Sequence, residues 1–179
     1  MIKKTIFLIL YYGFARHLPS SSNRIGGACW KSIRYFICKH IFKQCGKNVN
    51  IERKAWFGTG RNIIIGDNSG IGKNCRILNN TIIGKNVMMG PNCYMLEKTH
   101  KFDRTDICMI EQGVRKERDQ VIIEDDVWIG REVLFIGSKT VKTGSIIGAR
   151  CVLTKDFPEY SIIGGNPSKL IRNRLCQKK

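Results

Sequence analysis

The sequence lacks a long hydrophobic run. Its N-terminal apolar stretch, Thr5 to Phe14, covers ten residues, whereas a helix needs about twenty apolar residues to cross a bilayer. The stretch follows Lys3 and Lys4, as the apolar run of a signal peptide would, but no small-x-small cleavage motif comes after it. We therefore expect neither a membrane-spanning helix nor a cleaved signal.

Acidic residues are also scarce. The 14 Asp and Glu stand against 31 Lys and Arg, which gives a formal net charge of +17. This excess predicts an anionic partner: a phosphorylated cofactor, a phosphorylated or acidic glycan, or a negatively charged membrane surface. We expect no nucleic acid partner, because the basic residues are spread along the chain and no nucleic-acid-binding module is visible.

Paired metal-ligand and redox motifs are missing as well. None of the eight cysteines forms a C-x-x-C pair, so we expect reduced structural thiols in a cytoplasmic protein. The three histidines are His17, His40 and His100, and none lies in the repeats described next. A three-histidine zinc site is therefore excluded, and no metal is expected.

Two tracts of the chain repeat every six residues. Each repeat has an apolar residue and, four positions later, a mostly small one. A period of six fits neither a helix nor an alternating strand, and it is typical of a hexapeptide parallel β-helix, an all-β fold. The apolar positions are Ile51, Phe57, Ile65, Ile71, Ile77, Ile83 and Met89, then Ile123, Ile129, Phe135, Val141, Ile147 and Leu153. The small positions are Ala55, Ser69, Cys75, Thr81, Val87 and Cys93, then Val127, Val133, Ser145 and Cys151.

The repeat breaks at a few points. A two-residue slip at residues 63–65 predicts an irregular first coil, and Arg61 and Lys139 at small-residue positions predict local distortion or outward side chains. The largest break, about residues 95–121, is polar and predicts an excursion loop. A loop this long inside a compact domain is usually functional or disordered, and we favour function because this one interrupts a regular scaffold.

Three regions follow from these patterns. Residues 1–45 are expected to be helical, because Trp30, Ile33, Ile37 and Ile41 form one stripe of a basic amphipathic helix. These helices either pack on the end of the coil or a neighbouring subunit, or lie on the inner face of a membrane. Residues 46–165 form the β-helix. Residues 166–179 are expected to form a short C-terminal helix and a basic tail.

Several segments resemble the hexapeptide-repeat O-acetyltransferases, and the resemblance covers about residues 46–175. The amphipathic N-terminal region is most similar to the branch that modifies capsule, colanic-acid and O-antigen polysaccharides. The matching segments are His100–Asp106 with Gln112-Gly113, then Asp126-Val127-Trp128-Ile129-Gly130, Ile147-Gly148-Ala149, Leu153–Asp156 and Ile162–Pro167.

The resemblance implies a left-handed β-helix and a homotrimer that binds acetyl-CoA in the groove between subunits, without a metal. His100 matches the catalytic base, which takes a proton from an acceptor hydroxyl as that hydroxyl attacks the thioester. Asp103 is our candidate to orient His100, with Glu97, Asp106 and a backbone carbonyl as alternatives. Trp128 matches a position beside the catalytic centre, although it would serve equally well in packing the loop against a coil.

Other residues match cofactor-binding positions of the family. The pantetheine arm of CoA would contact Gly130 and Arg131, and the backbone of Gly148, Ala149 and Thr154. The CoA phosphates would meet Lys155, Lys169, Arg172 and Arg174, unless these residues belong to a solvated tail.

The leading hypothesis is an acetyl-CoA-dependent O-acetyltransferase that modifies a sugar of a surface polysaccharide or its precursor. Serine, amino-sugar and antibiotic acetylation are alternatives within the enzyme class. A non-catalytic β-helix scaffold is the alternative outside it.

Overall fold

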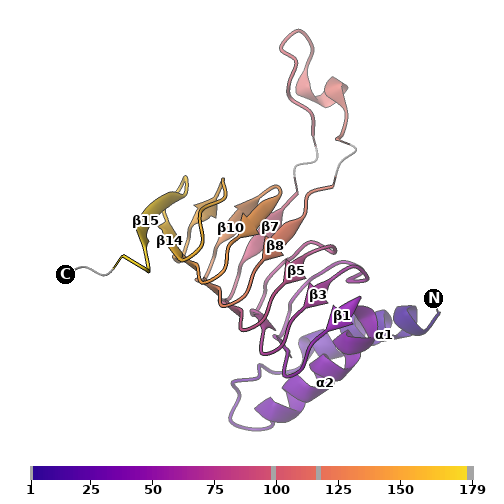
Figure 1. The fold of residues 1–179 in the computed structure, drawn as a ribbon. Helices are drawn as coiled ribbons and strands as arrows, with labels where there is room; N and C mark the ends of the chain where they lie inside the picture. Colours follow the sequence, from indigo (N-terminus) through magenta and orange to yellow (C-terminus); the bar gives the residue numbers. More distant parts are fainter. Residues whose placement is uncertain (1, 98–99, 116–117, 177–179) are drawn as a thin grey trace.

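A coil of short parallel strands makes up most of the molecule (Figure 1). The structure is a computed structural model, which describes residues 2–97, 100–115 and 118–176. The coil confirms the predicted hexapeptide β-helix. Its handedness stays a prediction from the resemblance.

A regular coil contains three hexapeptides. Ile65 pairs with Ile83, and Ile123 with Val141, in each case eighteen residues along the chain. Cys45 pairs with Ile65, twenty residues later, which confirms the irregular first coil. Ile83 pairs with Ile123, forty residues later, because the excursion loop interrupts that coil.

The strands form three faces of a prism. One face contains β1 (Gln44–Cys45), β3 (Ile64–Ile65), β5 (Ile82–Ile83), β8 (Val121–Ile123) and β11 (Lys139–Val141). The second contains β2 (Asn50–Ile51) and β4 (Gly70–Ile71), followed by β6 (Met88–Met89), β9 (Trp128–Ile129), β12 (Ile146–Ile147), β14 (Ser161–Gly164) and β15 (Lys169–Asn173). The third contains β7 (Tyr94–Leu96), β10 (Leu134–Ile136) and β13 (Val152–Leu153).

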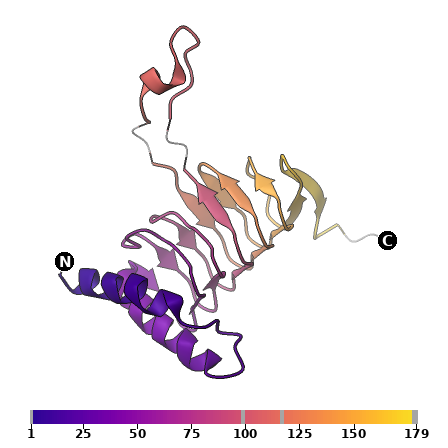
Figure 2. The same ribbon diagram turned by 180° about the vertical axis from the view of Figure 1, so that it is seen from behind.

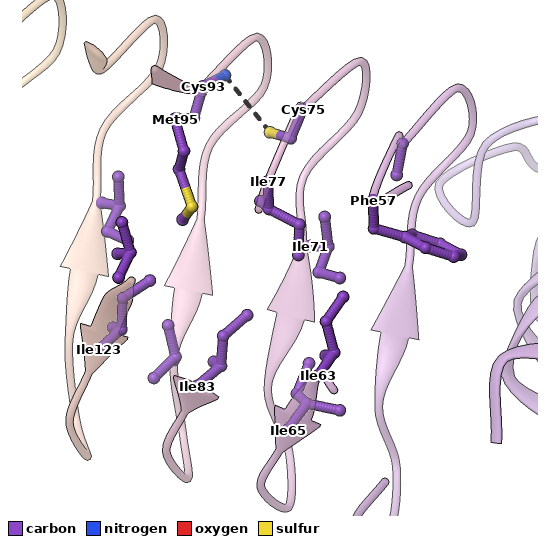
Figure 3. Packing of buried hydrophobic residues seen from close by; sticks show 14 of the residues in the cluster. Phe57, Ile63, Ile65, Ile71, Cys75, Ile77, Ile83, Cys93, Met95 and Ile123 are labelled. Atoms are coloured by element: carbon purple, nitrogen blue, oxygen red, sulfur yellow. Dashed lines mark hydrogen bonds between the residues drawn. The ribbon is translucent and has the colours of Figure 1, made fainter. Parts of the chain in front are cut away.

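The predicted apolar positions form the core. All of them are buried except Met89, which is half-buried, and every predicted small position is buried too. Figure 3 shows Ile65, Ile83 and Ile123 stacked from coil to coil. Small polar residues also link the coils, because Ser69 Oγ donates to Gly84 O (2.6 Å) and Cys93 Sγ to Gly130 O (3.1 Å). All eight cysteines are free thiols, as expected.

Of the two charged residues at small positions, only Lys139 departs from expectation. Lys139 is buried in the regular strand β11, and its ammonium donates to Ser138 O at 2.7 Å. The predicted distortion or outward side chain is therefore wrong here, since the aliphatic stem fills the position while the ammonium bonds locally. Arg61 is half-buried and donates to Thr5 Oγ1 of the N-terminal helix at 3.3 Å.

Two helices, α1 (Ile2–Gly13) and α2 (Gly27–Ile41), lie side by side across the first coil, with the 3₁₀ turn η1 (Ala15–His17) after α1 (Figure 2). The buried Tyr11 hydroxyl donates to Ala55 O at 3.0 Å, and Tyr12 donates to Gly58 O at 2.9 Å. These bonds attach α1 to the coil. None of the helices in the described part of the chain has the length and apolar character needed to cross a membrane.

The other end of the coil departs from prediction. Where a C-terminal helix was expected, β15 pairs antiparallel with β14 after a turn at Asn166–Pro167. The last coil presents unpaired backbone groups along β14, and β15 satisfies them by forming a hairpin. The expected short helix after residue 166 is therefore wrong.

Candidate active site

His100 lies on the excursion loop, which projects away from the coil between β7 and β8 (Figure 1). Its backbone bridges Val114 in an antiparallel arrangement, and Lys101 N donates to Gly113 O at 3.1 Å. The turn η2 (Met109–Gln112) stands on the returning side. Gln112 joins the two sides, because its amide accepts from Arg104 N (3.1 Å) and donates to Arg104 O (2.8 Å). The outer part of the loop is thus a hydrogen-bonded hairpin.

The imidazole of His100 is exposed, and it has no hydrogen-bond partner among the described residues. Asp103 is exposed and does not bond to it. Asp106 is engaged by the Arg104 guanidinium, whose hydrogen bonds lower the pKa of the Asp106 carboxyl. Asp103 as the orienting group stays a prediction, and Asp106 is the poorer alternative.

Trp128 stands on β9, on another face of the prism. The residue is 52% exposed, and its neighbours in register are Met88 on β6 and Ile146 on β12. The loop that carries His100 leaves from β7, which belongs to the face formed by β7, β10 and β13. The two candidate catalytic residues therefore start from different faces of one chain.

Gly130 and Gly148 lie where adjacent coils approach closely, and the approach is much tighter at Gly130. A Cβ atom at Gly130 would lie 2.6 Å from Ala149 N, and one at Gly148 would lie 3.3 Å from Ile163 O. Their own N–H groups donate to Ile147 O (2.8 Å) and Ile163 O (2.7 Å). These two amides are therefore already used within the coil and are not free donors for a cofactor.

The residues that follow these two glycines, Arg131 and Ala149, differ from them in their backbone hydrogen bonding. Arg131 and Ala149 occupy equivalent corners eighteen residues apart, and Arg150 N donates to Arg131 O at 2.8 Å. In the part of the chain that the structure describes, neither the Arg131 amide nor the Ala149 amide has an acceptor. Of the predicted cofactor contacts, these two offer free backbone donors. The Thr154 amide does not, because it donates to Ser168 Oγ at 3.1 Å.

The hydrogen bond between Thr154 and Ser168 also affects where two of the predicted phosphate-binding residues lie. Thr154 and Ser168 are the chain neighbours of Lys155 and Lys169, so the bond brings the backbones of these two lysines to the same corner. Lys155 lies over the Phe157 ring at 5.5 Å. Lys155, Lys169 and Arg172 are exposed and have no carboxylate partner among the described residues. Arg131 and Arg174 instead pair with Glu132 (3.3 Å) and Asp126 (3.5 Å).

One surface was missed by sequence reasoning. Trp56, Arg76 and Tyr94 are bridged in parallel on successive coils, and the Arg76 guanidinium lies 4.2 Å from the Trp56 ring and 5.3 Å from the Tyr94 ring. They line a hollow of about 480 Å³ with Arg16, Lys54 and Asn74. The hollow suits an anionic or ring-shaped ligand. The signal was available, since each of the three follows a small position of the repeat, where side chains face outward.

Among the described residues, no group of three His, Cys, Asp or Glu side chains is arranged to hold a metal ion.

Comparison with known proteins places the chain in a family. The model for bacterial transferase hexapeptide (six repeats) matches residues 62–96. Galactoside O-acetyltransferase of Escherichia coli K12 is 30% identical over 145 residues, which cover 78% of this chain and 68% of that protein. The chain belongs to the hexapeptide-repeat acetyltransferase family.

Two solved structures of this family share the fold. A maltose O-acetyltransferase from Clostridium difficile 630 is 27% identical with a TM-score of 0.72, covering 96% of this chain and 86% of that one. A galactoside acetyltransferase in complex with coenzyme A is 28% identical with a TM-score of 0.74, covering 96% and 80%. Other family members match only in part. The chain spans about a quarter of the chloramphenicol acetyltransferases, for example 26% of that of Agrobacterium fabrum, at 49% identity over 54 residues.

Proposed function

We propose that the protein is an acetyl-CoA-dependent O-acetyltransferase that acts on a sugar hydroxyl of a surface polysaccharide or its precursor. The observation that carries the proposal is His100: an exposed imidazole without a partner among the described residues, on a hydrogen-bonded loop that leaves a rigid coil. Family membership supports acetyl transfer, and the related galactoside acetyltransferase was solved with coenzyme A.

The reaction needs one proton carrier. His100 accepts the proton of the acceptor hydroxyl while the oxygen attacks the carbonyl carbon of the thioester. A carbon–oxygen bond forms and the carbon–sulfur bond breaks, so that CoA leaves as a thiolate and takes up the proton. Holding both substrates together removes the need for a covalent enzyme intermediate.

The donor site is built from the corner residues. The free amides of Arg131 and Ala149 hold the pantetheine arm, and Lys155, Lys169 and Arg172 meet the phosphates. Gly130 and Gly148 serve this site indirectly, because the close approach of the coils at these glycines positions the two amides.

The site is completed by a second copy of the chain. His100 and Trp128 start from different faces, and the loop points away from its own coil (Figure 1). In a closed homotrimer, the loop of one subunit lies against the exposed Trp128 and Met88 of the next. This arrangement buries apolar side chains that a single chain leaves in water.

The decisive experiment is calorimetric titration with acetyl-CoA, followed by an acceptor screen that contains sugars, amino sugars, serine and chloramphenicol. We expect one salt-sensitive site per chain. His100→Ala should retain that binding and lose transfer by about 10²- to 10⁴-fold, whereas His17→Ala should match the parent. Absence of binding to the folded protein would favour the scaffold, and an undiminished His100→Ala rate would remove the catalytic role.

A further inference from the structure

The outer side of α1 is apolar although it faces water. Phe7, Leu8 and Tyr11 on the inner side pack into the core cluster. Ile2, Ile6 and Ile9 stand on the opposite side and are 79%, 52% and 67% exposed. A helix that is apolar all round is normally covered on both sides. The outer side of α1 therefore needs a partner.

The apolar surface continues onto α2. Phe36 is exposed, and its ring meets the Phe7 ring edge-on at 6.1 Å between centroids. Leu10 of α1 and Phe14, the residue after α1, are exposed as well. We call the exposed side chains of Ile2, Ile6, Ile9, Leu10, Phe14 and Phe36 the helical patch. These residues belong to the layer that α1, the residue after it and α2 form at the start of the coil (Figure 2).

The charge of this layer indicates which partner fits. Residues 2–51 contain nine Lys and Arg and no Asp or Glu, so more than half of the net charge of +17 lies in this short segment. Lys3, Arg24, Lys39 and Lys43 of this segment are exposed. Covering the patch with a second copy would bring two such segments together, which like-charge repulsion disfavours. An anionic surface is complementary.

We propose that the helical patch binds the surface of an anionic lipid bilayer. The isoleucines of α1 enter the boundary between headgroups and acyl chains, while the surrounding Lys and Arg pair with lipid phosphates. The layer lies on the membrane and does not cross it. This inference does not depend on the proposed acetyl transfer, and its test uses no substrate.

The test is flotation of the full-length protein with vesicles of phosphatidylcholine alone or mixed with phosphatidylglycerol. We expect the protein to float with the mixed vesicles and to be released from them by salt. It should not bind the vesicles of phosphatidylcholine alone. Ile6→Gln with Ile9→Gln should weaken binding by roughly ten-fold or more, because each side chain gives up apolar burial. The matched control is Ile110→Gln with Ile171→Gln, which changes two exposed isoleucines outside the layer of α1 and α2 and should bind like the parent.

A second set of variants tests the contribution of positive charge to binding. Lys39→Gln with Lys43→Gln should weaken binding to the mixed vesicles, whereas Lys73→Gln with Lys85→Gln, exposed on the coil, should leave it unchanged. Failure to float, or equal binding to both vesicle types, would overturn the proposal. So would a change in oligomeric mass, measured by sedimentation, when Ile6 and Ile9 are replaced, since the patch would then be a subunit contact. Normal acetyl-CoA titration of the same variants would separate these outcomes from a failure of the proposed function.

Discussion

Replacing Arg34 should show how strongly the helical layer is joined to the coil. Arg34 is a fully buried residue of α2. Its Nε donates to Ile51 O at 2.5 Å and its Nη1 to Pro19 O at 2.8 Å, while Nη2 lies 3.8 Å from Glu52 Oε2. One side chain therefore connects the helix, the segment after η1 and strand β2.

The expected cost of Arg34→Met follows from what it leaves behind. Three carbonyl groups, those of Leu18, Pro19 and Ile51, lose the Arg34 donor, and the Glu52 carboxylate loses its cation. Removing one partner of a buried ion pair costs about 3–5 kcal/mol, which is a large share of a typical stability of about 5–15 kcal/mol. Urea unfolding followed by circular dichroism at one fixed protein concentration would measure it, since assembly alters apparent stability. Lys39→Met, exposed on the same helix, should change stability by less than about 0.5 kcal/mol.

Glu52 supplies the second half of the test. Burial raises the pKa of its carboxyl, but hydrogen bonds from Ser21, Arg53 N, Ser20 and Asn50 outweigh burial and lower it. A lowered folded-state pKa contributes stability above the unfolded value of about 4.3, and this stability is lost as the pH falls through the folded value. The gap in stability between the parent and Glu52→Gln should therefore be largest near neutral pH and close in acid.

Two outcomes would refute this reasoning. One is a loss below about 1 kcal/mol for Arg34→Met, which is what an exposed pair would give. The other is strict additivity of Arg34→Met and Glu52→Gln, because groups that share a partner should show a coupling of about 0.5–3 kcal/mol.

Three further predictions concern the coil and the donor site. Asn68 has a φ of 57°, so Asn68→Ala should lower the free energy of unfolding by about 1–2 kcal/mol, as measured by thermal unfolding. Asn68→Gly should lower it less, because glycine adopts this φ without strain. Equal losses in the two variants would contradict the backbone argument. A Cβ atom at Gly72 would lie 2.1 Å from Gly90 O, so Gly72→Ala should cost about 3 kcal/mol, whereas Gly148→Ala should be milder. Lys155→Ala with Lys169→Ala should raise the Kd for acetyl-CoA about ten-fold and reduce its salt dependence, and an unchanged Kd would remove these lysines from the site.

The core could be predicted from the sequence because each coil repeats the same environment. Ile65, Ile83 and Ile123 occupy one column (Figure 3), so a period of six identifies their burial without knowledge of distant contacts. The C-terminal hairpin could not be predicted in this way. Lys169–Asn173 becomes a strand because β14 needs a partner, and this need arises from the end of the coil and not from the local composition.

The same distinction applies to the site. The resemblance to the family predicted cofactor contacts at Gly130 and Gly148, which stay predictions. In the structure these glycines allow adjacent coils to approach, and their amides bond to the next coil. In a solenoid most strand amides bond to the neighbouring coil, so donors are left for a ligand mainly at corners. Arg131 and Ala149 stand at such corners. The other candidate functional side chains lie at outward positions of the strands or on the excursion loop. Trp128, Arg76 and His100 are examples, and the packing of the core does not restrict the residue type at these positions. The residues available for binding and catalysis in this fold are therefore those that neither pack in the core nor form hydrogen bonds between coils.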